Sequence, residues 1–469
     1  MNLRFNNGKQ LIELEKKIRP TNDIPYFIEN YIDFLSVMIG NEEDVFLKMK
    51  SAKDNRIGRL EHGEKNSPYY KYCLAEVELQ YAFCSFKFNA NFSSAYGINK
   101  AYRLLKKNQE EYPWFIQNLK GLGVIHSLVE NVPENYKWIV SLCGMESKPN
   151  DGIKELKKVF NFSLDVNSFA YMKIECAYLL TSVELMTGAD KNEQLILSKQ
   201  LDRIYTDSLY LNSPLLAYCR AKTAYSCHDA SKAEKIISYL KMSKENYPFC
   251  YLDYFTGILK LDRLDKDGVK YFNRFLSCYK GKDNIHSSYQ KMAWYYLINN
   301  DLEQYKRLMM QINKSGNSII DEDKQADNEA KSNIIPNEYL LKSRLLFDGG
   351  YYSEALEMLK KSVLTKSIHS KKDSLEYFYR AGRIYHEKGE TQKAIEYYIK
   401  TITNGIDEKY YYAANAALQL GIIYENSGND QLAMTYFQKV SSCKNTEYKN
   451  SIEQKAKNKL KRLKEKTKH

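Results

Sequence analysis

Glycine and proline are both scarce, with 21 and 9 among 469 residues. A turn-rich β protein would need more of both, so these counts favour long helices joined by short connections. No stretch approaches the roughly 18 uncharged apolar residues that a membrane span needs. A chain of this length is also too long for one compact core, unless it is an array of repeats that grows in one dimension.

Catalytic signatures are missing as well. The sequence has no H-E-x-x-H, no G-x-x-x-x-G-K-[ST] and no G-x-S-x-G. "GLGVIH" at 121–126 begins like a nucleotide-binding loop but has neither a third glycine nor a preceding strand. Cys227, His228 and Asp229 are adjacent, but they lie at a predicted hairpin turn, where neighbouring side chains rarely face one substrate. We therefore predict no catalytic residue, no metal and no cofactor, and we expect the chain not to be an enzyme.

Cysteines occur without a C-x-x-C pair, and their number, nine, is odd. Most lie among apolar residues in helical segments, which favours buried free thiols; a zinc site or a disulfide framework is the alternative. Free thiols indicate a reducing, cytoplasmic compartment, whereas the periplasm or cell envelope is the alternative if an upstream leader has been removed. The nine are Cys73, Cys84, Cys143, Cys176, Cys219, Cys227, Cys250, Cys278 and Cys443.

Tyrosine is abundant, at 40 residues, and such rings often fill the seams between helices. The net charge of +12 is uneven, because 444–469 holds ten Lys/Arg against three Asp/Glu and the other 443 residues carry only +5. We predict a basic capping helix here, with Ile452, Ala456, Leu460 and Leu463 on one face. Attraction of this tail to anionic lipid or nucleic acid is the alternative.

A repeat of 39 residues runs through the last third of the chain. Gly350, Gly389 and Gly428 share one phase, and each predicts a turn between two amphipathic helices. Gly382 is expected to allow a close neighbouring helix. Looser forms occur upstream at 72–113, 216–248, 250–276 and 288–312, while 114–190 has a weaker pattern broken by Pro133 and Gly144. The same phase is kept by Ala355, Ala394 and Ala433, and by Leu359, Tyr398 and Phe437.

This pattern resembles the tetratricopeptide repeat (TPR), with small residues at positions seven and eight, Tyr at eleven, Gly near fifteen, Ala at twenty and an aromatic at twenty-four. The usual period is 34, so this chain has five extra residues per repeat. The resemblance covers 336–443 well and 1–312 loosely. It implies an all-α fold, a right-handed α-solenoid of stacked helical hairpins. The tyrosine-, lysine- and asparagine-rich composition is similar to that of large bacterial TPR proteins of Bacteroidetes.

Four parts are predicted: a helical-hairpin array over 1–312, a polar linker or loop over 313–335, TPR repeats over 336–443, and the basic capping helix or tail. The segment 3–22 fits the second helix of a repeat whose first helix is absent, which would leave a seam exposed. Three explanations stay open: upstream residues are missing, a partner element covers the seam, or a non-repeat helix pair starts here.

The resemblance also implies a concave groove lined by the first helix of each hairpin. We expect Arg344, Tyr379 and Arg383 to hold an acidic or C-terminal peptide by charge-assisted hydrogen bonds, unless they are ordinary surface residues paired with neighbouring glutamates. Leu340 and Arg344 replace the Lys and Asn of the family's dicarboxylate clamp, which disfavours that ligand. The positions carried over are Asn337, Leu340, Arg344, Phe347, Glu376, Tyr379, Arg383, His386, Asn415, Leu418, Ile422 and Glu425.

The function that follows is a non-catalytic scaffold or adaptor that binds a protein or peptide partner, with no small-molecule substrate. The first alternative is an accessory protein whose basic tail contacts an anionic membrane or nucleic acid. A cryptic enzyme using 114–190 is the second.

Overall fold

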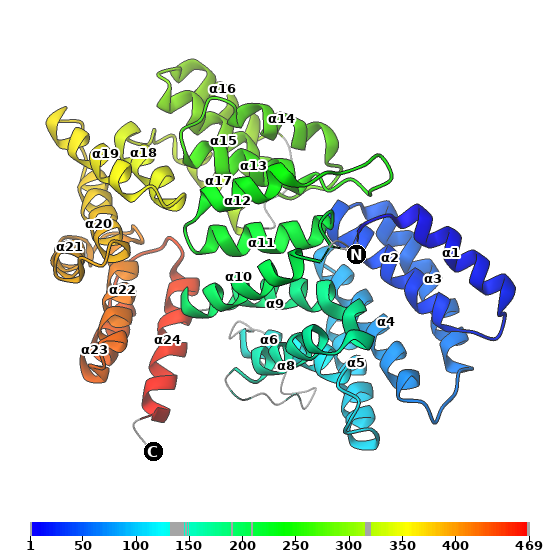
Figure 1. The fold of residues 1–469 in the computed structure, drawn as a ribbon. Helices are drawn as coiled ribbons and strands as arrows, with labels where there is room; N and C mark the ends of the chain where they lie inside the picture. Colours follow the sequence, from blue (N-terminus) through cyan, green and yellow to red (C-terminus); the bar gives the residue numbers. More distant parts are fainter. Residues whose placement is uncertain are drawn as a thin grey trace. The chain divides into compact units, whose positions relative to one another are not determined.

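The computed structural model describes residues 2–131, 145, 148, 150–188, 191–207, 210–314 and 320–466. Throughout these residues every regular element is a helix, and none of them is long and apolar enough to cross a membrane (Figure 1). The predicted all-α fold of stacked helical hairpins is confirmed. The expected breaks at Pro133 and Gly144, and Cys143, lie outside the described residues.

The chain divides into two compact units. The first consists chiefly of Met1–Gly257 and Lys270–Ile285, and the second of Ile258–Val269, His286–Ser315 and Asp321–His469. The first unit contains α1 (Phe5–Ile18), α2 (Ile24–Gly40), α3 (Glu43–Glu61), α4 (Pro68–Lys87), α5 (Asn91–Glu111), α6 (Asn118–Asn131), α8 (Asp151–Asp165), the short 3-10 helix η2 (Asn167–Met172), α9 (Lys173–Thr187), α10 (Lys191–Tyr205), α11 (Pro214–Ser226) and α12 (Ala230–Tyr239). Two helices, α13 (Tyr251–Asp262) and α14 (Gly268–Cys278), contribute to both units.

The second unit ends in three helical hairpins that follow the 39-residue phase. Gly350, Gly389 and Gly428 join the two helices of each hairpin with φ of +87°, +77° and +78°, a left-handed conformation that glycine adopts at no steric cost. The predicted turns are therefore confirmed. The helices are α15 (Ile285–Ile298), α16 (Leu302–Ile312), α17 (Asp321–Ser332), α18 (Glu338–Asp348), α19 (Tyr352–Leu364), α20 (Lys371–Glu387), α21 (Thr391–Gly405), α22 (Tyr412–Asn426), α23 (Asp430–Val440) and α24 (Lys449–Lys466).

The two helices of a hairpin approach closely at a glycine. A Cβ atom on Gly382 would lie 2.7 Å from Cδ1 of Tyr398, a ring that is fully buried. Gly421 meets Phe437 in the same way one repeat later. The expected close approach at Gly382 is confirmed. It explains why the repeat pattern has a small residue in the first helix of a hairpin and an aromatic residue at the facing position of the second.

The C-terminal helix α24 closes the last hairpin. Ile452, Ala456 and Leu463 are buried in one cluster with residues of α22 and α23, and Leu460 is partly buried beside them. These are the four residues predicted to share one face. The lysines occupy the rest of the helix, so its outer face is solvated and positively charged.

The first helix α1 packs within the first unit. A Cβ on Gly8 would lie 3.1 Å from Ile32 of α2, and Ile12 is buried. The backbone N–H of Tyr247 donates to the carbonyl of Leu3 at 2.7 Å, and the Tyr247 and Phe5 ring centroids are 5.1 Å apart. Residues about 240 positions downstream thus cover this end of the unit.

The prediction of a polar linker over 313–335 is wrong for 321–332, which form α17. Ala326 and Ala330 are buried, and the Asp323 carboxylate accepts a hydrogen bond from the Ser287 backbone N–H at 2.8 Å. Alanine is small and a good helix former, so a polar helix can pack closely on α15 without a strong apolar stripe. The polar composition of this segment is the reason that the sequence predicted a linker here.

The expectation of free thiols is also wrong for two cysteines. Cys250, at the start of α13, forms a disulfide with Cys278, at the end of α14, across 28 residues. Such a bond is typical of proteins in an oxidising compartment. The other described cysteines are free thiols: Cys73, Cys84, Cys176, Cys219, Cys227 and Cys443.

Thiol titration tests this bond. We expect reduction of the denatured chain to raise the number of titratable thiols by two, because one disulfide releases two sulfurs. Non-reducing peptide mapping should recover the peptides of Cys250 and Cys278 as one species that separates on reduction. An unchanged thiol count would contradict the disulfide.

Candidate functional site

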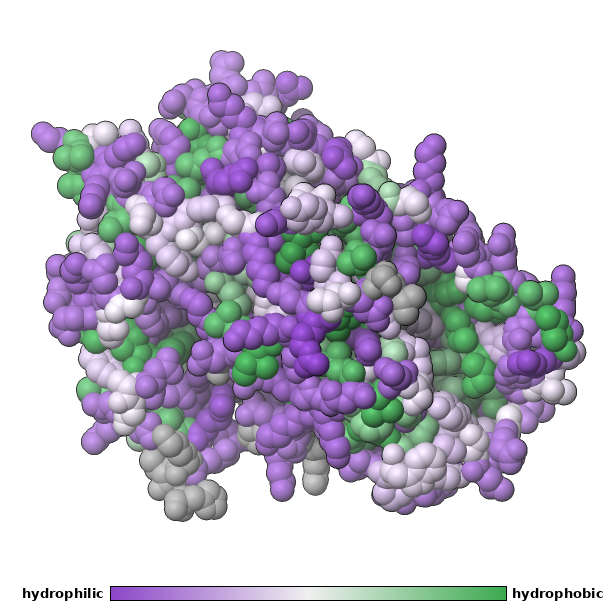
Figure 2. Space-filling model, in the orientation of Figure 1, coloured by the Kyte–Doolittle hydropathy of each residue, from purple (hydrophilic) through white to green (hydrophobic). Residues whose placement is uncertain are grey.

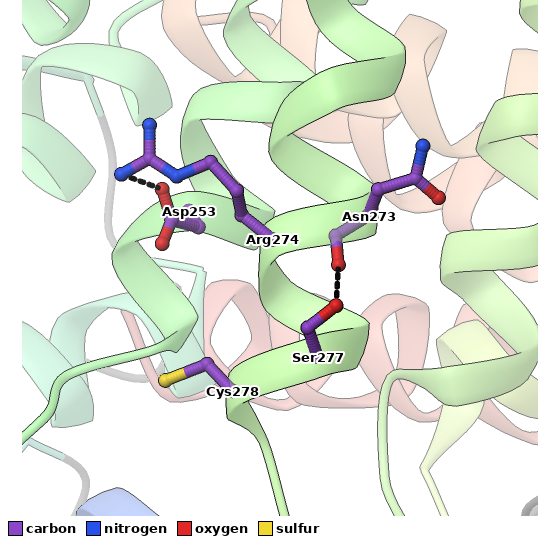
Figure 3. Close-up of a pocket in the computed structure, with 5 residues that line it drawn as sticks. All are labelled: Asp253, Asn273, Arg274, Ser277 and Cys278. Carbon is purple, nitrogen blue, oxygen red and sulfur yellow. Dashed lines mark hydrogen bonds and ion pairs between the residues drawn. The ribbon is translucent and has the colours of Figure 1, made fainter.

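Two shallow depressions lie on the described surface, one in each unit. One shallow depression lies over α13 and α14, lined by Asp253, Asn273, Arg274, Ser277 and Cys278 (Figure 3). Arg274 pairs with Asp253 at 2.9 Å, and the Ser277 hydroxyl donates to the Asn273 carbonyl at 2.8 Å. Because these polar groups pair with one another, they do not indicate a catalytic site or a ligand-binding site. The face shown in Figure 2 is mainly hydrophilic, with hydrophobic residues in scattered patches.

Cationic side chains gather on successive helices of the second unit. We call Lys291 of α15, Arg344 of α18, and Arg380 and Arg383 of α20 the cation row. Lys291 Nζ lies 4.1 Å and Arg344 Cζ 4.8 Å from the ring centroid of Trp294, so one indole carries two cations. The positive charge of Arg380 repels that of Arg344 and acts to lower the pKa of Arg344. The α18 and α20 helices are in contact, which brings these side chains to one face.

Trp294 is held from α17. Its indole N–H donates to Glu329 at 2.9 Å, and the same carboxylate accepts from Gln290 at 2.7 Å and from Tyr305 at 3.3 Å. Trp294 is 2% exposed. The helix that the sequence presented as a linker therefore fixes the aromatic platform on which Lys291 and Arg344 lie.

The charge of Lys291 is poorly compensated. Burial, followed by repulsion from Arg344, lowers the pKa of Lys291 to about 8, although Glu329, Asp262 and Glu322 oppose this. Its amine donates to the neutral Gln290 side chain at 3.0 Å. The described residues place no carboxylate within ion-pair distance of Lys291. An added negative charge at this point would relieve the repulsion.

Arg383 lies among aromatic side chains. Burial acts to lower its pKa, but Tyr379, Tyr398 and Glu387 favour its charge and bring the pKa above its usual value. Its guanidinium lies 4.8 Å over the Phe347 ring and donates to the Tyr379 hydroxyl at 3.1 Å. Its Nε is buried without a hydrogen-bond partner, and among the described residues no carboxylate lies within ion-pair distance. Asn415 also donates to Tyr379, at 2.9 Å. Tyr379, 1% exposed, therefore orients Arg383 rather than offering its own ring to a ligand.

The third arginine, Arg380, is neutralised within the fold. It pairs with Glu376 at 3.0 Å, and Tyr412 donates to the same carboxylate at 2.8 Å. Burial acts to raise the pKa of Glu376, but Arg380, the Tyr412 hydroxyl and Arg344 together bring it below its usual range. This pair is structural, so a close carboxylate within the fold already neutralises the charge of Arg380. Arg344 has a distant partner in Asp348, at 3.9 Å, and its side chain is 26% exposed.

The structure brings together six of the nine nominated groove residues: Arg344, Phe347, Glu376, Tyr379, Arg383 and Asn415. The other three have local roles. Asn337 caps α18, His386 contacts Tyr398, and Glu425 pairs with Lys459 of α24 at 2.8 Å. Of the apolar positions carried over, Leu340 and Leu418 are buried and Ile422 is half-buried.

Sequence reasoning missed Lys291, Trp294, Glu329 and Arg380. Lys291 and Trp294 are three residues apart on one helix, which is a usable signal for a stacked pair. It went unnoticed because α15 lies outside the clear repeats. Glu329 gives no signal, since the polar composition of its segment predicts a linker.

Part of the second unit matches a known family model. Residues 375–403 and 414–443 match the tetratricopeptide repeat model. These two segments are similar to tetratricopeptide repeats. They contain α20–α21 and α22–α23, and the 39-residue phase extends the same hairpin pattern to α18–α19. Tetratricopeptide repeats typically serve as protein-binding scaffolds without catalysis.

Two solved structures align along most of the chain. The APC/C hetero-tetramer Cut9–Hcn1 shares 12% identity over 97% of this chain and 92% of that chain, with a TM-score of 0.24. A circular tandem repeat protein with novel repeat topology shares 10% identity over 94% and 95%, with a TM-score of 0.21. At such scores neither supports an inference about this chain. A search of curated proteins gives no significant match.

Proposed function

We propose that the chain is a non-catalytic scaffold that binds a protein or peptide partner through the cation row. The observation that supports this is the gathering of Lys291, Arg344 and Arg383 beside aromatic rings. The described residues give these three cations one carboxylate within ion-pair distance, Asp348 at 3.9 Å from Arg344. Stabilising buried positive charge without a counter-ion is costly, so such a surface is suited to a negatively charged ligand. The segments that match the tetratricopeptide repeat model include Arg380 and Arg383 of the row, and repeats of this kind commonly bind protein partners.

The ligand chemistry follows from the donors. Arginine guanidiniums present several N–H groups in a plane and bind carboxylates by charge-assisted hydrogen bonds. Arg344 and Arg383 lie on neighbouring helices, so a segment with two acidic groups can contact both. The composition, rich in tyrosine, lysine and asparagine, further leads us to propose a bacterial origin of the Bacteroidetes type.

An affinity pull-down from the native organism's lysate tests the site. We expect the amount of specific partner recovered with the double variant Arg344→Ala/Arg383→Ala to fall at least tenfold, because both charge-assisted contacts disappear. The matched control is Lys361→Ala/Lys388→Ala, which removes two exposed cations away from the row. Circular dichroism and the melting temperature establish that each variant is folded.

The outcomes are distinct. Partners lost only from the double arginine variant support the proposal. An unchanged partner list would contradict it. Partners retained by that variant but removed by raised salt would favour the second candidate, the basic outer face of α24, where Lys457, Lys461 and Lys464 line a shallow surface.

A further inference from the structure

Lys291 lies in an unusual setting for a lysine amine. Its Nζ is 4.1 Å from the ring centroid of Trp294, and Cζ of Arg344 lies 4.8 Å from the same centroid. Because both distances end at one point, the two cations are no farther apart than about 10 Å, the range over which charges interact at 0.1 M salt. One buried indole therefore holds an amine and a guanidinium near each other.

No acidic group holds this amine in an ion pair. Its hydrogen bond goes to the neutral side-chain oxygen of Gln290, at 3.0 Å. Over the described part of the chain, no carboxylate lies within ion-pair distance of the Lys291 Nζ. Lys342 of α18, by contrast, pairs with Glu338 one helical turn away. The Lys291 amine is therefore free of the contact that usually keeps a half-buried lysine charged.

The surroundings also favour the neutral amine, which is the nucleophilic form. Burial, and then Arg344, lower the pKa of Lys291 to about 8, against the carboxylates of Glu329 and Glu322 on α17 and of Asp262 on α13. Near pH 8 about half of the Lys291 amines are neutral, against well under one in a hundred for a lysine with the usual pKa of about 10.4. A second cation beside a desolvated lysine is a known way to activate the amine.

Arg344 adds a group that can bind an anion. Its side chain is 26% exposed, and its carboxylate partner, Asp348, is distant at 3.9 Å. A guanidinium binds phosphate oxygens by paired, charge-assisted hydrogen bonds. Lys291 is half-buried, so a small reagent is better suited to it than a bulky one. The arrangement suits a small electrophile that carries a phosphate.

We propose that Lys291 is an acylation site that reacts with acyl phosphates, and that Arg344 binds the phosphate of the donor. The neutral Nζ attacks the carbonyl carbon and forms the N–C bond. The C–O bond to the phosphate breaks, inorganic phosphate leaves with its electron pair, and the proton lost from nitrogen goes to water. The product is an uncharged amide, so the cation row loses one charge and Arg344 loses a repulsion. This inference does not depend on which partner the row binds.

Site-resolved acetylation of the full chain tests this, with acetyl phosphate at pH 8 as the probe. Digestion after glutamate residues and mass spectrometry give the rate at each lysine. We expect Lys291 to react at least tenfold faster than Lys361 and Lys388, which are exposed lysines of the same unit. Its rate should level off above pH 8, where the amine has lost its proton, whereas the exposed lysines should gain rate up to about pH 10.

The variant Arg344→Met separates binding of the donor from reactivity of the amine. Methionine fills part of the same space but cannot bind phosphate. We expect the rate at Lys291 to fall at least tenfold with acetyl phosphate. With p-nitrophenyl acetate, an uncharged donor, the fall should be smaller, because only the effect of Arg344 on the amine is lost. Lys361 and Lys388 of the same molecule are internal controls for donor concentration.

The wild type alone can contradict the proposal, since acetylation of Lys291 no faster than of Lys361 would exclude an activated amine. That comparison needs no substitution, so it holds even where a variant fails to fold. An equal fall with both donors in Arg344→Met would exclude phosphate binding by Arg344. Partners lost from the Arg344→Ala/Arg383→Ala variant in the pull-down, with no preferred acetylation of Lys291, would leave the binding surface standing and remove the acylation site.

Discussion

Replacing Lys120 with methionine should lower the free energy of unfolding of the first unit by about 3–5 kcal/mol at neutral pH. Lys120, on α6, is 2% exposed. Its Nζ lies 2.7 Å from the Glu76 carboxylate of α4 and 2.5 Å from the Glu175 carboxylate of α9. Removal of the cation leaves two carboxylates facing each other in the interior, where ionised groups without a partner are costly.

The loss should shrink in acid. Burial, and then Glu175, already raise the pKa of Glu76, while Lys120 holds it down. Without Lys120 this pKa rises further, and a buried carboxyl with a raised folded-state pKa gains stability as the pH falls through that value. The deficit of the variant relative to the wild type should therefore be smaller at pH 5 than at pH 8.

Urea denaturation followed by circular dichroism at both pH values measures this. The double variant Lys120→Met/Glu76→Gln is the control, because it removes the cation together with one of the two charges and should recover part of the loss. A deficit below about 1 kcal/mol, typical of an exposed ion pair, would show that Lys120 is not a buried counter-ion. A deficit that does not change between pH 5 and pH 8 would lead to the same conclusion.

Adding one methyl group at Gly421 should destabilise the C-terminal repeats by about 1–3 kcal/mol. The Cβ of an alanine here would collide with the Phe437 ring, which is 2% exposed and has no room to move. Helix propensity favours alanine over glycine by about 1 kcal/mol, so the sign of the effect distinguishes crowding from propensity.

The matched control is Gly58→Ala, at a helical glycine of α3 whose added Cβ has nothing within 4 Å. It should stabilise the chain slightly. Thermal unfolding measures both variants, and Phe437→Leu in the Gly421→Ala background should restore part of the loss by making space. A neutral or stabilising Gly421→Ala would contradict the close approach of α22 and α23.

The repeats could be predicted because their determinants are local. Gly421 and Phe437 are sixteen positions apart and recur with a fixed period, so the small-against-large packing of one hairpin is visible in the sequence. Gly389 and Gly428 likewise mark left-handed turns that few other residues favour. The hydrophobic face of α24 was visible for the same reason, since four residues at helical spacing suffice to define it.

The rest depends on residues that meet only after folding. The carboxylate partners of Lys120, Glu76 and Glu175, lie 44 positions before it and 55 positions after it in the sequence. Charged residues in a helix usually indicate solvent exposure, so the sequence gives no sign of this buried cluster. Cys250 and Cys278 show no local spacing motif. In the candidate site, the tetratricopeptide phase predicts Arg344 and Arg383 on one face, and this stays a prediction. The phase gives no sign that Tyr379 is buried or that the Trp294 indole donates to Glu329.

The contact of Tyr247 with Leu3 has a consequence for how the chain is made. At about 5–20 residues per second, a ribosome needs roughly 10–50 s to add the 240 residues that separate these partners. Until then Leu3 and Phe5 lack the surface that buries them. A translation product that is interrupted before Tyr247 therefore lacks part of the surface that covers these apolar residues, and is prone to aggregation or to binding by chaperones.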